Sequence, residues 1–193
     1  MDSLAKRSFD LVLSIFGLIV FSPLLLIIAV ALLFSLGWPV LYSPQRAGRS
    51  NTLFTMRKFR SMKIAEGPVS HHSGDDDPRV TTVGRWIRKF KLDELPQLWN
   101  IVKGEMSFVG PRPEVPHFVN DLEDKLPYYA ERHMVKPGIT GWAQINFPYG
   151  ASIEDSRHKL EYDLYYAKNY TPFLDLLILL QTLRVILFPA GAR

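Results

Sequence analysis

Cysteine is absent from the 193 residues of this chain. A disulfide framework, a thiolate metal site and catalysis by a cysteine nucleophile are therefore excluded. The absence is also usual for a protein that works in a reducing compartment. A chain of this length has room for one compact core and an anchor, but not for two ordinary domains beside an apolar segment.

Charge is absent from Leu11 to Gln45. Leu, Ile, Val, Phe and Ala dominate this stretch as far as Val40, which predicts a membrane segment. A cleavable signal peptide has a shorter apolar region followed by a small-residue cleavage site. Here the apolar run continues past Ser22-Pro23, so we expect the segment to be retained.

Two features favour a segment that enters the membrane and returns over one that crosses it. Lys6 and Arg7 precede the segment and a dense basic run follows it, so the positive-inside rule places both ends on the cytoplasmic side. Pro23 lacks an amide hydrogen, and the hydroxyl of Ser22 can bond a carbonyl that loses its donor. An ordinary proline-kinked transmembrane helix is the alternative. The charge symmetry and the break favour a re-entrant hairpin over residues 1–40.

Basic residues gather directly behind this segment, although the net charge of the chain is only +4. Such a run suits anionic lipid headgroups or a phosphate-bearing substrate. Nucleic acid is disfavoured as a partner, because the run follows a membrane-type segment and the chain has no nucleic-acid-binding motif. The run comprises Arg46, Arg49, Arg57, Lys58, Arg60 and Lys63.

Residues 41–193 are predicted to form a small α+β domain that is mainly helical. Extended pieces at 40–42 and 53–59 predict a hairpin. An amphipathic helix over 82–90 suits the membrane surface, and the apolar helix over 173–188 suits an interfacial or buried place. Further helices are expected over 93–103 and from Ser152 to about Lys168, where Ser152 and Asp155 resemble a capping box. Residues 107–116 predict a stiff, irregular loop.

The adjacent carboxylates of Asp93 and Glu94 follow Lys91 at the expected start of a helix. Carboxylates in that place are stabilised as anions, so the pair should be ionised and available to bind a divalent cation or to attack phosphorus. Acidic residues in a first helical turn are also routine caps, and the two residues alone leave that alternative open.

Other polar residues carry weaker signals. Arg112 lies between two prolines, where its guanidinium is held in a fixed direction that suits a diphosphate or simply points to solvent. The segment 136–141 combines a lysine with two glycines, and a plain turn is its simpler explanation. His71 and His72 precede three aspartates at 75–77, but this polar run lacks the spacing of a metal site.

Several longer strings resemble the bacterial sugar transferases, which are monotopic phosphoglycosyl transferases. The strongest is KLDELPQLWNIVKGEMSFVGPRP at 91–113. Ser22-Pro23 matches the helix break of that family. The other strings occur in family order and extend the resemblance over nearly the whole chain: KFRSM at 58–62, DPRVT at 77–81, KPGITGWAQ at 136–144 and EYDLYYAKN at 161–169.

The resemblance implies a covalent two-step transfer. Asp93 would attack the sugar-linked phosphate of a UDP-sugar, expel the nucleoside monophosphate and hold the phosphosugar until a polyprenyl (undecaprenyl) phosphate takes it. Glu94 would be the partner of Asp93, either binding Mg²⁺ together with it or orienting the site. The expected substrate-binding residues are Lys58, Arg60, Arg79, Arg112 and Asp163.

The resemblance also implies a location in the cell. Membrane lipid would surround the re-entrant segment, and the catalytic domain would lie on the cytoplasmic face of the bacterial inner membrane. A homodimer is left open. The chain resembles a minimal form or an excised catalytic part, and residues 145–150 lack the Asn-Gly-Arg often found there, which leaves the sugar undefined. A non-catalytic scaffold that binds nucleotide-sugars and a bitopic signalling protein are the alternatives from other classes.

Overall fold

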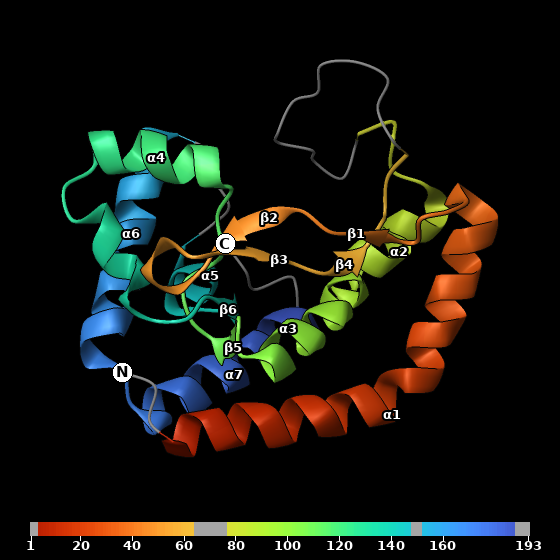
Figure 1. The fold of residues 1–193 in the computed structure, drawn as a ribbon, viewed down its shortest axis with the longest axis horizontal. Coiled ribbons are helices and arrows are strands. Elements are labelled where there is room, and N and C mark those ends of the chain that lie inside the picture. The colour runs from red at the N-terminus through yellow and green to blue at the C-terminus, as the bar shows by residue number, and fades with distance from the viewer. Residues whose placement is uncertain (1–3, 64–76, 148–151, 188–193) are drawn as a thin grey trace.

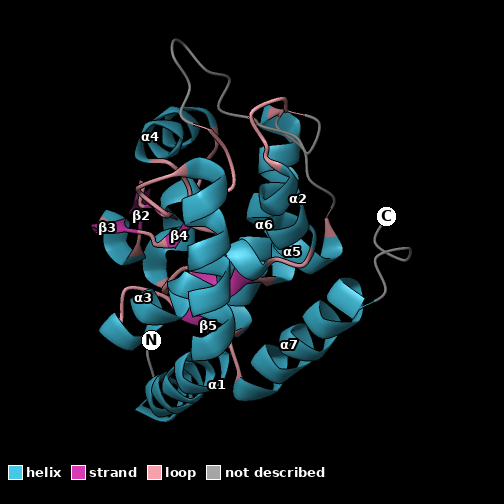
Figure 2. Cartoon of the chain, turned by 90° about the vertical axis from the view of Figure 1, so that its right-hand side faces the viewer, coloured by secondary structure: helices cyan, strands magenta, loops and turns pink. Residues whose placement is uncertain are grey.

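The computed structural model describes residues 4–63, 77–147 and 152–187 (Figure 1). Helices dominate, and short strands lie among them (Figure 2), which confirms the mainly helical prediction. The helical elements are α1 (Leu4–Leu36), η1 (Arg49–Asn51), α2 (Thr82–Lys89), η2 (Leu92–Gln97), α3 (Leu98–Lys103), α4 (Pro116–Lys125), η3 (Tyr129–Met134), α5 (Trp142–Asn146), α6 (Ile153–Asn169) and α7 (Pro172–Leu187). The strands are β1 (Leu41–Tyr42), β2 (Gln45–Ala47), β3 (Leu53–Thr55), β4 (Lys58–Phe59), β5 (Ser107–Val109) and β6 (Gly138–Thr140).

The first helix bends without being interrupted. Pro23 lies inside α1, which Figure 1 shows turning sharply along its course around the body. In an α-helix the N–H of residue 23 would bond the carbonyl of Ile19, and proline leaves that carbonyl without its donor. The hydroxyl of Ser22 donates to the Ile19 carbonyl at 2.7 Å. The predicted break at Ser22-Pro23 is therefore a bend inside one helix, and the serine has the compensating role expected of it.

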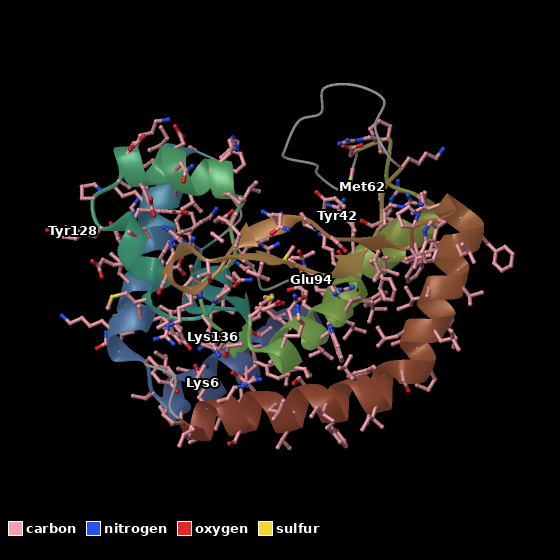
Figure 3. All side chains as sticks on the ribbon, in the orientation of Figure 1. Lys6, Tyr42, Met62, Glu94, Tyr128 and Lys136 are labelled. Carbon is pink, nitrogen blue, oxygen red and sulfur yellow. The ribbon has the colours of Figure 1, made fainter. Side chains whose placement is uncertain are left out.

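Basic side chains attach the start of α1 to the body. The Lys6 ammonium lies 2.5 Å from a carboxylate oxygen of Asp175 in α7 (Figure 3 labels Lys6). Arg7 donates to the carbonyls of Ile101 and Val102 at 2.6 and 2.7 Å. These carbonyls end α3, where a cation complements the helix dipole.

The end of α1 is attached to the same body by another arginine. Arg60, which follows β4, donates to the carbonyls of Leu36 and Gly37 at 2.6 and 2.7 Å. Only 8% of Arg60 is exposed. Both ends of the bent helix are thus bound to one globular unit.

The outward side of α1 is apolar and exposed. By length and composition, α1 alone among the described helices is able to cross a membrane. Large apolar side chains project along its length, including Phe16, Ile19, Leu26, Ile27 and Phe34. A contiguous apolar surface of this kind is unfavourable in water and marks a membrane or protein contact.

Most of the local predictions for residues 41–193 are confirmed. The expected hairpin is present, with β2 paired to β3 and β1 to β4, both antiparallel. Helices α2 and α7 lie where the apolar patterns place them. The capping box at the start of α6 is complete: Ser152 accepts from the N–H of Asp155, whose side chain accepts from the N–H of Ser152.

One local prediction is wrong, and another is confirmed only in part. The predicted loop at 107–116 begins with β5, which pairs in parallel with β6. Gly110 and Gly138 allow this pairing, because a Cβ on Gly110 would lie 2.2 Å from the Lys136 carbonyl oxygen. The predicted helix at 93–103 is a 3₁₀ helix followed by a short α-helix. Pro96 lies inside the 3₁₀ segment, and Lys91 before it adopts a left-handed φ of 55°.

Protonation of His133 is expected to destabilise the fold in acid. The imidazole is buried, and neither ring nitrogen has a hydrogen-bond partner within the described ranges. Burial lowers the pKa of His133 from 6.5 to about 4. Between these two pH values His133 is protonated in the unfolded chain but stays neutral in the folded one. The free energy of unfolding therefore decreases as the pH falls from 6.5 to about 4.

At its steepest this loss is about 1.4 kcal/mol per pH unit. Urea unfolding of the wild type and of His133→Phe across this range measures it. The wild type should lose stability relative to His133→Phe as the pH falls, by up to that amount per pH unit. A difference that stays constant with pH would contradict the assignment to His133.

Candidate active site

The two adjacent carboxylates each face a cation from another part of the chain. Asp93 and Glu94 both lie in η2. A carboxylate oxygen of Asp93 is 3.8 Å from the Lys58 ammonium in β4. A carboxylate oxygen of Glu94 is 3.6 Å from the guanidinium of Arg112, which follows β5. Figure 3 shows Glu94 in the middle of the view, between the β2–β3 hairpin and α3. Four of the predicted site residues are thus brought together.

Local backbone geometry places these groups. Lys91 makes the tight left-handed turn between α2 and η2, and its carbonyl accepts from the N–H of Glu94 at 3.2 Å. Successive side chains of a strand point to opposite faces. In β4, Lys58 points to Asp93, and the neighbouring Phe59 packs in the cluster that includes Ile28 and Leu32 of α1.

Burial controls the charge of Asp93. Only 5% of Asp93 is exposed, and desolvation raises the pKa of its carboxyl. Lys58 opposes that shift and Glu94 adds to it. Burial also lowers the pKa of Lys58. Desolvation thus outweighs the favourable charges near Asp93 and shifts its pKa upward, opposite to the effect expected of a helix N-terminus. A more basic carboxylate oxygen is also a better nucleophile.

One oxygen of Asp93 is open to a further ligand. Its Oδ1 is buried and has no hydrogen-bond partner in the described part of the chain. No group of three or more His, Cys, Asp or Glu side chains suited to a metal occurs in the residues described. Mg²⁺ is often held by one or two carboxylates together with substrate phosphates and water. Asp93 and Glu94 therefore fit a magnesium ion that takes its remaining ligands from phosphate.

The other predicted residues are engaged elsewhere. Arg60 bonds the end of α1, as described above. The Arg79 guanidinium donates two hydrogen bonds to the Asp77 carboxylate, at 2.9 and 2.6 Å. Asp163 is buried in an ion pair with Arg132 at 2.8 Å. His71, His72 and the neighbouring aspartates at 75 and 76 lie outside the described residues, as do residues 148–150.

Arg132 connects Asp163 to the site, and the sequence pattern does not single it out. Its guanidinium donates to Asp163 at 2.8 Å and to the carbonyl of Arg112 at 2.9 Å. The Tyr129 hydroxyl accepts from it at 3.2 Å. Arg132 thus holds the backbone of the residue whose side chain faces Glu94. Asp163 affects the site through this chain of contacts.

Asn100 is a second residue that sequence reasoning does not single out. Its side-chain amide donates to the Thr55 carbonyl at 2.8 Å and to Glu105 at 2.6 Å. Its carbonyl oxygen accepts from the Arg57 N–H at 2.9 Å. Fully buried, Asn100 fixes the segment that carries Lys58 against α3. Because both the amide group and the carbonyl oxygen of Asn100 are hydrogen-bonded, the buried side chain favours one packing of these segments over others.

Comparison with known proteins gives one family. The family described as bacterial sugar transferase matches residues 1–189. A Bacillus subtilis protein named uncharacterized sugar transferase EpsL is 42% identical over 192 residues, which cover 97% of this chain and 90% of the relative.

Longer relatives carry functional names. UDP-N-acetylgalactosamine-undecaprenyl-phosphate N-acetylgalactosaminephosphotransferase of Aeromonas hydrophila is 44% identical over 189 residues, or 97% of this chain and 45% of the relative. UDP-glucose:undecaprenyl-phosphate glucose-1-phosphate transferase of Escherichia coli is 40% identical over 185 residues, or 94% of this chain and 40% of the relative. The chain spans less than half the length of these two proteins.

Proposed function

Because the chain belongs to the bacterial sugar transferase family, we propose that it moves a sugar-1-phosphate from a UDP-sugar to polyprenyl phosphate. The observation that carries the proposal is the buried Asp93 beside Glu94, with Lys58 and Arg112 facing the two carboxylates. The names of the two longer relatives include both undecaprenyl phosphate and a UDP-linked sugar.

The proposed reaction has two displacements at one phosphorus. A carboxylate oxygen of Asp93 forms a bond to the sugar-linked phosphorus, and the bond to the nucleoside monophosphate breaks, so that UMP leaves with the electron pair. An oxygen of the polyprenyl phosphate then attacks the same phosphorus, and the bond to Asp93 breaks. The carboxylate is regenerated, and no net proton transfer is required.

Fixed cations lower the repulsion between anionic reactants. Lys58 and Arg112 are held near Asp93 and Glu94 before substrate binds, so little reorganisation is needed during the reaction. Mg²⁺ bound by Asp93 and Glu94 would supply further positive charge for the phosphate oxygens. Arg132 and Asp163 keep the Arg112 backbone in place.

The bent α1 supports a re-entrant attachment to the cytoplasmic face of the bacterial inner membrane. Cations join both ends of the helix to one body, while its outward side is apolar. A straight span would carry those ends to opposite sides of the bilayer. In the proposed orientation, the bend dips into the hydrocarbon and the active site stays at the lipid surface.

The function is tested by release of UMP from a panel of UDP-sugars by the purified 193-residue chain in lipid nanodiscs. We expect release that requires Mg²⁺ and polyprenyl phosphate for multiple turnovers, with one sugar preferred. Binding of UDP-sugars without any release of UMP would contradict the proposal and support the non-catalytic scaffold.

The acid limit of the reaction should depend on Lys58. Burial places the pKa of Asp93 above its ordinary value, and the nearby ammonium partly opposes this shift. Because the nucleophile must be ionised, activity falls as the pH drops through that pKa. Lys58→Met removes the opposing charge, so the acid limb of kcat/KM should move to higher pH. Lys168→Met, which removes a charge from the exposed face of α6, is the control. An unmoved limb in Lys58→Met would show that Lys58 does not tune Asp93.

A further inference from the structure

The short parallel sheet of β5 and β6 carries Arg112, whose guanidinium faces Glu94 in the candidate active site. Arg112 follows Val109, the last residue of β5, by three positions. Each strand has only three residues. A sheet of two strands is marginally stable on its own in water. Other elements must therefore hold it in place.

Two polar side chains of α1 bond consecutive residues of β5. A carboxylate oxygen of Asp10 accepts from the N–H of Phe108 at 3.2 Å. The Lys6 ammonium donates to the carbonyl of Val109 at 3.3 Å (Figure 3 labels Lys6). Residues four positions apart lie on one face of a helix. Asp10 is buried, and only 10% of the Lys6 side chain is exposed, so one inward face of α1 holds β5.

Helices α6 and α7 complete this support. The Tyr166 hydroxyl of α6 lies 3.0 Å from the carbonyl oxygen that Lys6 also bonds. Asp175 of α7 pairs with Lys6 and so fixes the direction of its ammonium. Also in α7, the hydroxyl of Thr182 lies 2.7 Å from that of Thr140 in β6. Side chains of the long helices thus hold both strands.

The backbone between β5 and Arg112 is stiff. The N–H of Gly110 donates to the Thr140 carbonyl at 2.9 Å. Pro111 and Pro113 flank Arg112, and the ring of each proline fixes its own φ. A shift of β5 is therefore passed on to Arg112, because the residues between them cannot absorb it.

We propose that Lys6 and Asp10 are positioning residues for Arg112. They hold β5, and β5 sets where the guanidinium lies beside Glu94 when the phosphates of the donor bind. The inference rests on the proposed function, in which Arg112 is one of the fixed cations. It adds that the helix proposed to enter the membrane also sets the geometry of the active site.

The test uses variants at the two positions of α1, in lipid nanodiscs. Asp10→Leu removes the acceptor for the Phe108 N–H at similar side-chain volume, whereas Asp10→Asn keeps an acceptor oxygen. Lys6→Met removes the bond to Val109. Arg7→Met is the matched control, because it removes the neighbouring charge, which bonds the end of α3 instead. Single-turnover release of UMP from UDP-sugar, without acceptor, measures the first step, and tryptophan fluorescence reports the fold.

We expect Asp10→Leu and Lys6→Met each to slow UMP release by about tenfold, because a small misplacement at an active site can cost up to about a hundredfold in rate. Asp10→Asn and Arg7→Met should stay near the wild-type rate. Lys6→Met also breaks the buried pair with Asp175. The two positions are tested independently, so one still decides the question if the variant at the other does not fold.

The same changes in an Arg112→Gln background separate positioning from general stability. Arg112→Gln removes the guanidinium and should slow the reaction by itself. Because Asp10→Leu and Lys6→Met act through that guanidinium, adding either to Arg112→Gln should cost little further rate. A purely structural effect would instead cost the same factor in both backgrounds.

The proposal is wrong if Asp10→Leu and Lys6→Met keep the wild-type rate, or if they lose the same factor with and without Arg112. It is also wrong if Asp10→Asn is as slow as Asp10→Leu. Equal losses in Arg7→Met and Lys6→Met would assign the effect to the charge of α1 and not to its bond with β5. Each of these results leaves the transferase standing. A wild type that releases no UMP from any UDP-sugar would remove the proposed function, and this inference with it.

Discussion

Asp93→Asn is expected to lower turnover by about four orders of magnitude or more, because the amide cannot serve as the attacking carboxylate. Wild type incubated with UDP-sugar and Mg²⁺, without acceptor, should gain the mass of one sugar phosphate. The Asn variant should gain none. The substitution is nearly isosteric, so the fold should be retained.

Glu94→Gln separates the nucleophile from its partner. This variant keeps Asp93 and should still form the covalent product, but more slowly, because one proposed ligand for Mg²⁺ and the ion pair between Glu94 and Arg112 are lost. Peptide mapping of the trapped product should find the sugar phosphate on Asp93. A covalent product on another residue, or turnover retained in Asp93→Asn, would refute the proposed nucleophile.

Arg132→Met should be the most destabilising single change of an ion pair within the described residues. Arg132 and Asp163 are 4% and 3% exposed, and among the described residues no other cation is bonded to the carboxylate that the substitution leaves behind. Breaking one partner of a buried pair costs about 3–5 kcal/mol. Lys125→Met breaks the exposed pair with Asp121 and should cost at most about 1 kcal/mol. Urea unfolding monitored by tryptophan fluorescence compares the two.

A double variant separates stability from positioning. Arg132→Met with Asp163→Leu replaces the pair by apolar side chains and should recover most of the lost stability. It does not restore the bond to the Arg112 carbonyl, so kcat should remain low while the protein is folded. Full activity in the stable double variant would show that the pair has only a structural role.

The family and the main helices were predictable from the sequence because their signals are local. The cap of α6 depends on two residues three positions apart, and α2 and α7 follow from apolar spacing. The string that contains Asp93 and Glu94 is continuous, and the family match confirms the resemblance. The contacts of Asp93 with Lys58 and of Glu94 with Arg112 join segments far apart in the chain, and the predicted site groups these same residues.

The remaining features depend on contacts that no local pattern encodes. The β5–β6 pairing joins two three-residue strands that lie about thirty positions apart in the sequence, so neither shows a strand signal. Arg60 belongs to a family string, yet its contacts are with the end of α1. The pKa of Asp93 is set by burial, which a helix-dipole argument from sequence does not include.

The bent helix also affects how the protein is made. Ile28 and Leu32 of α1 are buried against Phe59 and Ile87, so the helix supplies part of the core of the body. During synthesis α1 emerges before those partners, and its apolar side favours early entry into the bilayer. In the proposed orientation, the rest of the chain would then complete its core against a helix already held by lipid. In the proposed membrane orientation, insertion of α1 would be a folding step, and we expect the proposed activity only where a bilayer is present.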